Sequence, residues 1–183
     1  MNVGSITNSN LLGGWTLELE SAEKMPQKLA TAFGNLFGNK FGGSYLPVYY
    51  VGKQVVNGTN YKLIAERTKQ VSGGKTIKDF AVTTINIPLG DIRAEKATVV
   101  SEEDATDFIL RDEIETGVKK ALADFTSVNH KPILELGEQI VKGKNYYFIC
   151  ESKGNFSDAE PYLTRIAINN FQNNWTIDEI ERL

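Results

Sequence analysis

One stretch of this sequence occurs twice, with Gln54 of the first copy and Gln139 of the second 85 positions apart. The two copies cover residues 46–61 and 131–146. Identical residues hold equivalent places in both: Pro47 and Pro132, Gly52 and Gly137, Gln54 and Gln139, Val56 and Val141, Gly58 and Gly143, Asn60 and Asn145, and Tyr61 and Tyr146. A fixed internal offset is the signature of repeated structural units. The chain is therefore predicted to be an internal duplication, with one unit over residues 11–98 and the other over residues 99–183.

The same offset relates two helical patterns that precede the repeated stretch. In both patterns apolar residues recur four positions apart, which places each trio on one face of a predicted helix. The trios are Leu29, Phe33 and Phe37 in the first copy and Ile114, Val118 and Leu122 in the second. Pro26 suits the start of the first helix. Each unit is therefore predicted to contain one helix.

A hairpin is predicted after each helix. In the first copy it joins residues 48–56 to residues 60–66 through Asn57-Gly58, and Asn-Gly is the strongest short hairpin signal. In the second copy it joins residues 133–141 to residues 145–151 through Lys142-Gly143. Both turns are predicted to be tight, because glycine adopts a positive φ without steric cost.

A second hairpin is predicted further along each copy. In the first, residues 80–87 pass through Pro88-Leu89-Gly90 to Ile92, and in the second, residues 163–171 lead to Trp175. At this point the alignment shifts by one residue and pairs Asn86 with Asn170. Each unit is thus predicted to have an α+β fold, because a lone amphipathic helix needs an apolar sheet face to cover. The helix is expected to pack on a four- to five-stranded antiparallel sheet.

Charge and composition disfavour several classes of function. The net charge is −3 and no long basic run is present, which argues against a nucleic-acid partner. No apolar stretch approaches the roughly 18 residues that span a bilayer.

Cys150 lies in an apolar run and is predicted to be an inert buried thiol, while His130 is predicted to lie in a turn. No catalytic residue, metal site or cofactor is predicted, so the protein is not expected to be an enzyme.

Residues 1–10 lack the apolar region of a signal peptide. With a single cysteine in the chain, this favours a cytoplasmic location, and a secreted protein whose signal has been removed is the other possibility. Asn57, Asn155 and Asn174 each begin a glycosylation sequon. Two of these would carry sugar on the turns described above, which again favours a compartment without glycosylation.

The repeated turn resembles the first binding loop of cystatins. Both copies fit Gln-x-Val-x-Gly, and Asn60-Tyr61 and Asn145-Tyr146 are similar to the cystatin strand that follows this loop. Gly13-Gly14 resembles the N-terminal glycine of the cystatin trunk, and Trp175 lies where the family places the tryptophan of its second loop. The likeness covers nearly the whole chain, as two tandem cystatin-like units.

This resemblance implies a reversible, tight-binding inhibitor of papain-like cysteine proteases, with a monomer favoured. In cystatins the trunk and two hairpin loops form a wedge that enters the protease cleft. The protease-binding residues implied here are Gly13, Gly14, Gln54, Val55, Val56, Asn57, Gly58, Pro88, Leu89, Gln139, Ile140, Val141, Lys142, Gly143, Asn174 and Trp175. Gly58→Glu and Gly143→Glu are each predicted to disable one wedge while leaving folding intact.

Each copy keeps only part of the cystatin pattern. The second has residues 98–100 where the glycine pair would align and Asn174-Trp175 in place of Pro-Trp, whereas the first has Pro88-Leu89 there. Trp175 follows a turn and is expected to be exposed, with a binding or a structural role. The main alternative is a non-inhibitory interaction module of cystatin fold. An enzyme that uses Glu66 and Glu151 is the least favoured possibility.

Overall fold

The structure, a computed structural model, describes residues 14–39, 43–104 and 110–183. The chain divides into two compact units after Asp104. We call residues 12–104 the N-terminal unit and residues 105–183 the C-terminal unit. Each is described by itself.

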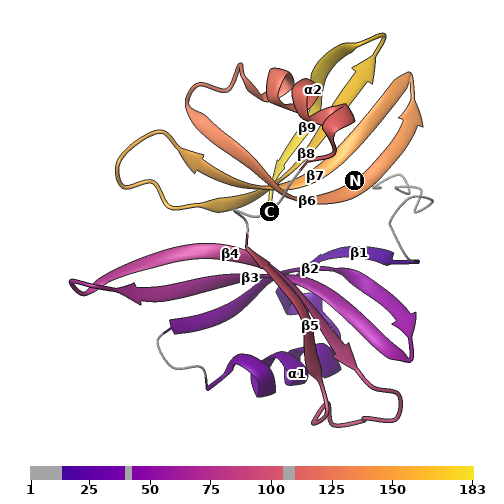
Figure 1. Cartoon of the computed structure of the whole chain (residues 1–183), viewed down its shortest axis with the longest axis vertical. Helices are drawn as coiled ribbons and strands as arrows, with labels where there is room; N and C mark the ends of the chain where they lie inside the picture. The colour runs from indigo at the N-terminus through magenta and orange to yellow at the C-terminus, as the bar shows by residue number, and fades with distance from the viewer. Residues whose placement is uncertain (1–13, 40–42, 105–109) are drawn as a thin grey trace. The chain divides into compact units, whose positions relative to one another are not determined.

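In the N-terminal unit the described residues form a five-stranded antiparallel sheet and one α-helix (Figure 1). Along the chain its elements are β1 (Thr16–Ser21), the 3-10 turn η2 (Ala22–Lys24), α1 (Gln27–Phe37), β2 (Gly43–Val56), β3 (Gly58–Val71), β4 (Lys75–Ile87) and β5 (Thr98–Asp104). The strands lie side by side in their sequence order, and every pair of neighbours is antiparallel.

In the C-terminal unit the described residues form a four-stranded antiparallel sheet and one helix. The elements are α2 (Asp112–Leu122), β6 (Val128–Val141), β7 (Gly143–Gly154), β8 (Tyr162–Phe171) and β9 (Asn174–Arg182). These strands also follow their sequence order across the sheet.

The prediction of an α+β fold is wrong, because the chain is mostly β. Most of the described residues lie in strands, and these form two antiparallel sheets of five and four strands with only two short helices. The error comes from the strand lengths. Pairing between β3 and β4 continues to Val71 and Lys75, and β7 continues to Gly154. The arms of β3 and β4 are mostly polar and exposed, so their composition is that of a loop, but cross-strand hydrogen bonds keep them extended.

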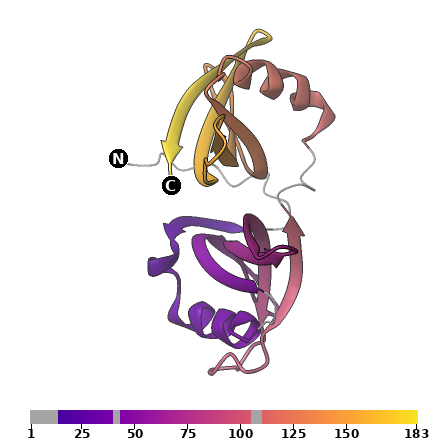
Figure 2. The same cartoon turned by 90° about the vertical axis from the view of Figure 1, so that its left-hand side faces the viewer.

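Both helices lie where the apolar spacing predicts them, and each lies against the sheet of its own unit (Figure 2). Leu29, Phe33 and Phe37 of α1 are buried in one cluster with Tyr50 and Leu63. Ile114 and Val118 of α2 are buried with Phe148 and Ile166. Burial of a large apolar side chain contributes roughly 1.5 to 3 kcal/mol. Each helix therefore completes a core that is supplied mainly by strands.

Two details of the predicted second hairpins are wrong. The strand expected at Ile92 begins at Thr98 instead, and residues 88–97 form turns. Residues 98–100 stand where the second copy would have its glycine pair. They form the start of β5, and β5 pairs with β4. The predicted alignment of Asn86 in the first copy with Asn170 in the second is off by one. Asn86 lies opposite Asn60 in its sheet, and the residue opposite the equivalent Asn145 is Asn169. A shift of one residue turns every side chain to the other face of a sheet.

Candidate functional site

The two repeated turns are hairpin tips in which one residue separates the strands. Val56 pairs with Gly58 across Asn57, and Val141 pairs with Gly143 across Lys142. Both glycines have positive φ, 104° at Gly58 and 91° at Gly143. A Cβ at Gly58 would lie 2.4 Å from the carbonyl oxygen of Ile87, and one at Gly143 would lie 2.4 Å from that of Asn170. Glycine is therefore needed twice over, for its φ and for the close approach of the next strand.

Behind each tip the repeated polar residues form a cross-strand row of amides. Asn60 Nδ2 donates to Gln54 Oε1 at 3.0 Å, and Asn86 Nδ2 donates to Asn60 Oδ1 at 2.8 Å. In the C-terminal unit Asn169 Nδ2 donates to Asn145 Oδ1 at 2.7 Å. Gln139 accepts from Tyr147 Oη at 3.0 Å. The repeated glutamine and asparagine thus stabilise the tips and fix their register.

The residues between these amides and the glycines project into solvent. Val55 is 79% exposed and Ile140 is 83% exposed, and their neighbours Val56 and Val141 are also exposed. Exposed apolar groups held on a rigid backbone are suited to binding, because little conformational entropy is lost when a partner covers them. Each tip therefore presents a small, preformed apolar surface.

In the N-terminal unit a second apolar loop lies beside the tip. Gly58 approaches Pro88 and Leu89 closely, because its Cβ position is 2.9 Å from the Pro88 Cα. Leu89 and Ile92 are each 86% exposed. The loop is held from within: the Asp91 carboxylate accepts from the backbone N–H groups of Glu95 and Lys96, at 3.1 and 2.8 Å. Ala94, with φ of 55°, is buried in the core beside α1.

The chain enters the N-terminal unit at the same edge. Thr16 pairs with Lys53, so the start of β1 lies next to the end of β2. Gly14 has φ of 72° and is exposed, and Gly13 lies outside the described residues. Trp15 is half-buried, with Lys62 Nζ 4.6 Å from its ring centroid. The register therefore brings Gly14, the Asn57-Gly58 tip and Leu89 together at the same end of the strands of one sheet. We call these three segments the N-terminal edge.

The C-terminal unit brings together fewer of the predicted residues. Its second hairpin ends in a two-residue turn, with φ of 52° at Gln172 and 63° at Asn173. Asn174 is exposed, but Trp175 turns back onto its own unit. Its ring stacks on Tyr146 at 5.5 Å between centroids and fills the space over Gly117 of α2, where an added Cβ would lie 2.0 Å from the indole. The structural role of Trp175 is thus clear, and no anchor projects from this second loop.

A shallow polar hollow lies beside the C-terminal tip. Its volume is about 320 Å³, and it is lined by Val141, Lys142, Asn145, Asn169 and Asp178. The polar groups are already engaged with one another: Asn145 Nδ2 donates to Asp178 Oδ2 at 2.8 Å, and Asn169 Nδ2 donates to the Lys142 carbonyl at 3.2 Å. These hydrogen bonds therefore stabilise the tip.

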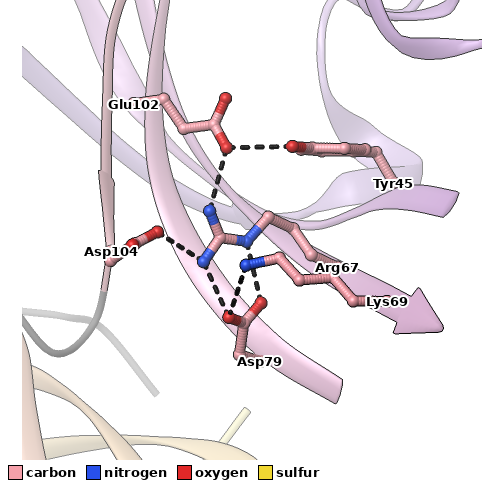
Figure 3. Close-up of polar contacts among 6 residues, drawn as sticks. All are labelled: Tyr45, Arg67, Lys69, Asp79, Glu102 and Asp104. Atoms are coloured by element: carbon pink, nitrogen blue, oxygen red, sulfur yellow. Dashed lines mark hydrogen bonds and ion pairs between the residues drawn. The ribbon is translucent and has the colours of Figure 1, made fainter. Parts of the chain in front are cut away.

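A cluster around Arg67 is the main polar constellation that the sequence analysis missed (Figure 3). The buried Arg67 guanidinium on β3 forms a two-pronged pair with Asp79 of β4, with both N···O distances at 2.8 Å. It also bonds Glu102 at 3.0 Å and Asp104 at 2.5 Å, both on β5. Tyr45 Oη donates to Glu102 at 3.1 Å. The cluster lies at the end of the sheet away from the tip and fastens β5 to the unit.

The Arg67 cluster is expected to make the free energy of unfolding depend on pH in the acid range. Burial by itself raises the pKa of Asp79, but hydrogen bonds and charge from Arg67, and then from Lys69, outweigh it and lower that pKa. An aspartate with a lowered pKa stabilises the fold above its unfolded pKa of about 3.9, and this stabilisation is lost as pH falls through the folded value. We therefore expect Asp79→Asn to be destabilised at pH 7 and to converge on the parent in stronger acid. Urea unfolding at several pH values measures this, with Asp158→Asn on an exposed turn as the control. A constant difference down to the acid limit would contradict it.

The lone histidine is placed differently from the prediction. His130 lies in β6 and is buried, and not in a turn. Its Nδ1 is 2.7 Å from Ser152 Oγ, which is 2.6 Å from Thr164 Oγ1. Burial lowers the pKa of His130. All three side chains are buried, so this is an internal hydrogen-bond chain closed to a substrate.

Cys150 is buried as predicted, and burial raises the pKa of its thiol, which makes it a poor nucleophile. Across the described ranges, no group of three or more His, Cys, Asp or Glu side chains is placed to hold a metal ion. Nor does any helix there have the length and apolar character needed to cross a membrane.

Comparison with known proteins adds no family: no protein-family model matches the chain, and no curated protein matches it.

Proposed function

We propose that this chain is a reversible inhibitor of papain-like cysteine proteases and that the N-terminal edge is the part that enters the protease cleft. One observation carries the proposal: strand register places Gly14, the Asn57-Gly58 tip and the Leu89 loop at the same edge of one sheet. These are the segments that the resemblance to cystatins assigns to protease binding. The proposal concerns this edge and does not depend on the fold class.

The physical properties of the edge suit a cleft. Val55, Leu89 and Ile92 offer apolar surface, and the amide row and the Asp91 turn hold the backbone behind them. Occlusion requires no chemistry from the inhibitor, only a preorganised surface that excludes substrate. The surroundings of Gly14 are open to a partner, since even an added Cβ there would have no neighbour within 4 Å.

The two units are not equivalent in this proposal. In the C-terminal unit Ile140 is as exposed as Val55, but Trp175 is committed to packing against α2. The Lys142 ammonium also lies 5.2 Å from the Phe171 ring centroid, so this tip carries a charge. We therefore assign most of the affinity to the N-terminal unit.

Titration of papain with the purified chain tests the proposal. Val55→Glu should weaken inhibition at least thirtyfold, because a buried anchor at an interface contributes about 2 kcal/mol or more. Ile140→Glu should have a small effect. Ile77→Glu is the matched control, since Ile77 is an exposed strand residue that pairs with Lys69 at the other end of the sheet. Absence of inhibition at micromolar concentration, or full potency of folded Val55→Glu, would contradict the proposal.

A non-inhibitory interaction module is the second candidate, and the packing of Trp175 within its own unit favours it. In that case the exposed residues at the tips bind a partner other than a protease. A folded chain that leaves papain fully active would support this candidate over the first.

A further inference from the structure

Asn57 has four features that the proposed function does not require. It is the only asparagine in the sequence that precedes a glycine. It forms the whole connection between β2 and β3, and it is exposed. Among the described residues, no hydrogen bond or ion pair is made by its side chain. Asn60, three residues later, is instead held by Gln54 and Asn86.

We propose that Asn57 is a site of spontaneous deamidation, which limits the lifetime of the N-terminal edge in its original form. Asparagine is among the least heat-stable residues. Gly58 places no side chain between its own amide nitrogen and the Asn57 carboxamide. Solvent reaches Asn57, so the water that completes the reaction is at hand.

The reaction needs only water. The Gly58 amide nitrogen, after losing its proton, attacks the Asn57 side-chain carbonyl carbon, and the C–N bond to the amide group breaks to release ammonia. The product is a five-membered cyclic imide. Water then opens the imide at either carbonyl and gives aspartate or isoaspartate. Overall, one water is consumed and one ammonia is released.

Both products change the tip. Aspartate adds a negative charge beside the exposed Val55 and Val56. Isoaspartate also lengthens the backbone by one carbon, in a connection where Val56 already pairs with Gly58 across a single residue. Gly58 cannot move away freely, because its Cβ position lies 2.4 Å from the Ile87 oxygen. The isoaspartyl form should therefore displace the tip.

Prolonged incubation of the folded chain at mildly alkaline pH, followed by tryptic digestion and fragment-ion mass spectrometry, tests the proposal. Cleavage after Lys53 and Lys62 releases both Asn57 and Asn60 in one peptide, residues 54–62. We expect Asn57 to gain the mass of an amide-to-acid change about ten times faster than Asn60, with both aspartyl and isoaspartyl forms present. Asn57→Gln should abolish the fast conversion.

Lys142→Asn supplies the matched variant, because it creates an Asn-Gly pair on the equivalent C-terminal tip. This second site should convert at a rate similar to that of Asn57. If Asn57 converts in the denatured chain but stays intact in the folded one, the tip geometry protects it and the proposal is wrong. The readout is chemical, so it stands or falls independently of protease inhibition.

Discussion

Replacement of Gly58 by alanine is expected to lower the free energy of unfolding by about 3 kcal/mol or more. Two costs add at this position. A non-glycine residue with φ of 104° is strained, and its Cβ would lie 2.4 Å from the Ile87 oxygen and 2.9 Å from the Pro88 Cα. The contacts are with backbone, so neither strand can yield without breaking its pairing. Gly143→Ala is expected to cost a similar amount, because Asn170 and Phe171 approach it in the same way.

Gly74→Ala separates these two costs. Gly74 also has a positive φ, 73°, but its Cβ position has no neighbour within 4 Å. Only the conformational strain should remain, which is about 1 kcal/mol. Urea unfolding of the three variants against the parent gives the comparison. Equal, small losses for all three would show that the close approach at Gly58 and Gly143 does not matter.

These contacts correct the prediction that Gly58→Glu or Gly143→Glu would leave folding intact. Any Cβ at either position meets the backbone of the next strand, so such variants would confuse loss of binding with loss of structure. Val55→Glu and Ile140→Glu are the appropriate substitutions, because both side chains are directed into solvent.

The sequence predicts features that depend on neighbouring residues. The helix that contains Leu29 and Phe33 and the tips at Gly58 and Gly143 follow from local spacing and turn chemistry. The duplication and the resemblance to cystatins remain predictions. Exposure of Trp175 could not be judged locally, because it depends on the gap that Gly117 leaves on α2.

Features that depend on strand register were missed or misplaced. Nothing near Arg67 in the sequence points to Glu102, which lies 35 residues away and meets it only because β3, β4 and β5 are neighbours. The acidic run at the end of β5 was instead assigned to the second unit. The alignment of Asn86 with Asn170 failed for the same reason, because the cross-strand register that places Asn86 opposite Asn60 and Asn169 opposite Asn145 cannot be seen along the sequence.

Arg67→Met is expected to lower the free energy of unfolding by about 3 kcal/mol. Methionine keeps much of the side-chain volume but removes the charge and the hydrogen bonds to Asp79, Glu102 and Asp104. Loss of one partner from a buried ion pair is costly, because the carboxylates then repel one another with less compensation. The carboxylates are partly exposed, which keeps the loss well below that of a fully buried cluster.

Lys69→Met is the matched control. Lys69 also pairs with Asp79, at 3.3 Å, but its side chain is about half exposed. Its replacement should cost less than about 1 kcal/mol, as is usual for surface pairs. Urea unfolding of both variants at pH 7 makes the comparison, and a loss at Arg67 no larger than that at Lys69 would contradict the argument.

The effect of Arg67→Met should also be local to β5. This strand is an edge strand with mostly exposed side chains, so apolar burial holds it weakly and the cluster carries a large share of its attachment. Amide hydrogen exchange in β5 should therefore accelerate more than exchange in β3. Adding Glu102→Gln to Arg67→Met should recover part of the stability, because it removes one of the charges left without a cation. If it recovers none, packing and not charge is what Arg67 supplies, and the interpretation of Figure 3 as an ionic clamp is wrong.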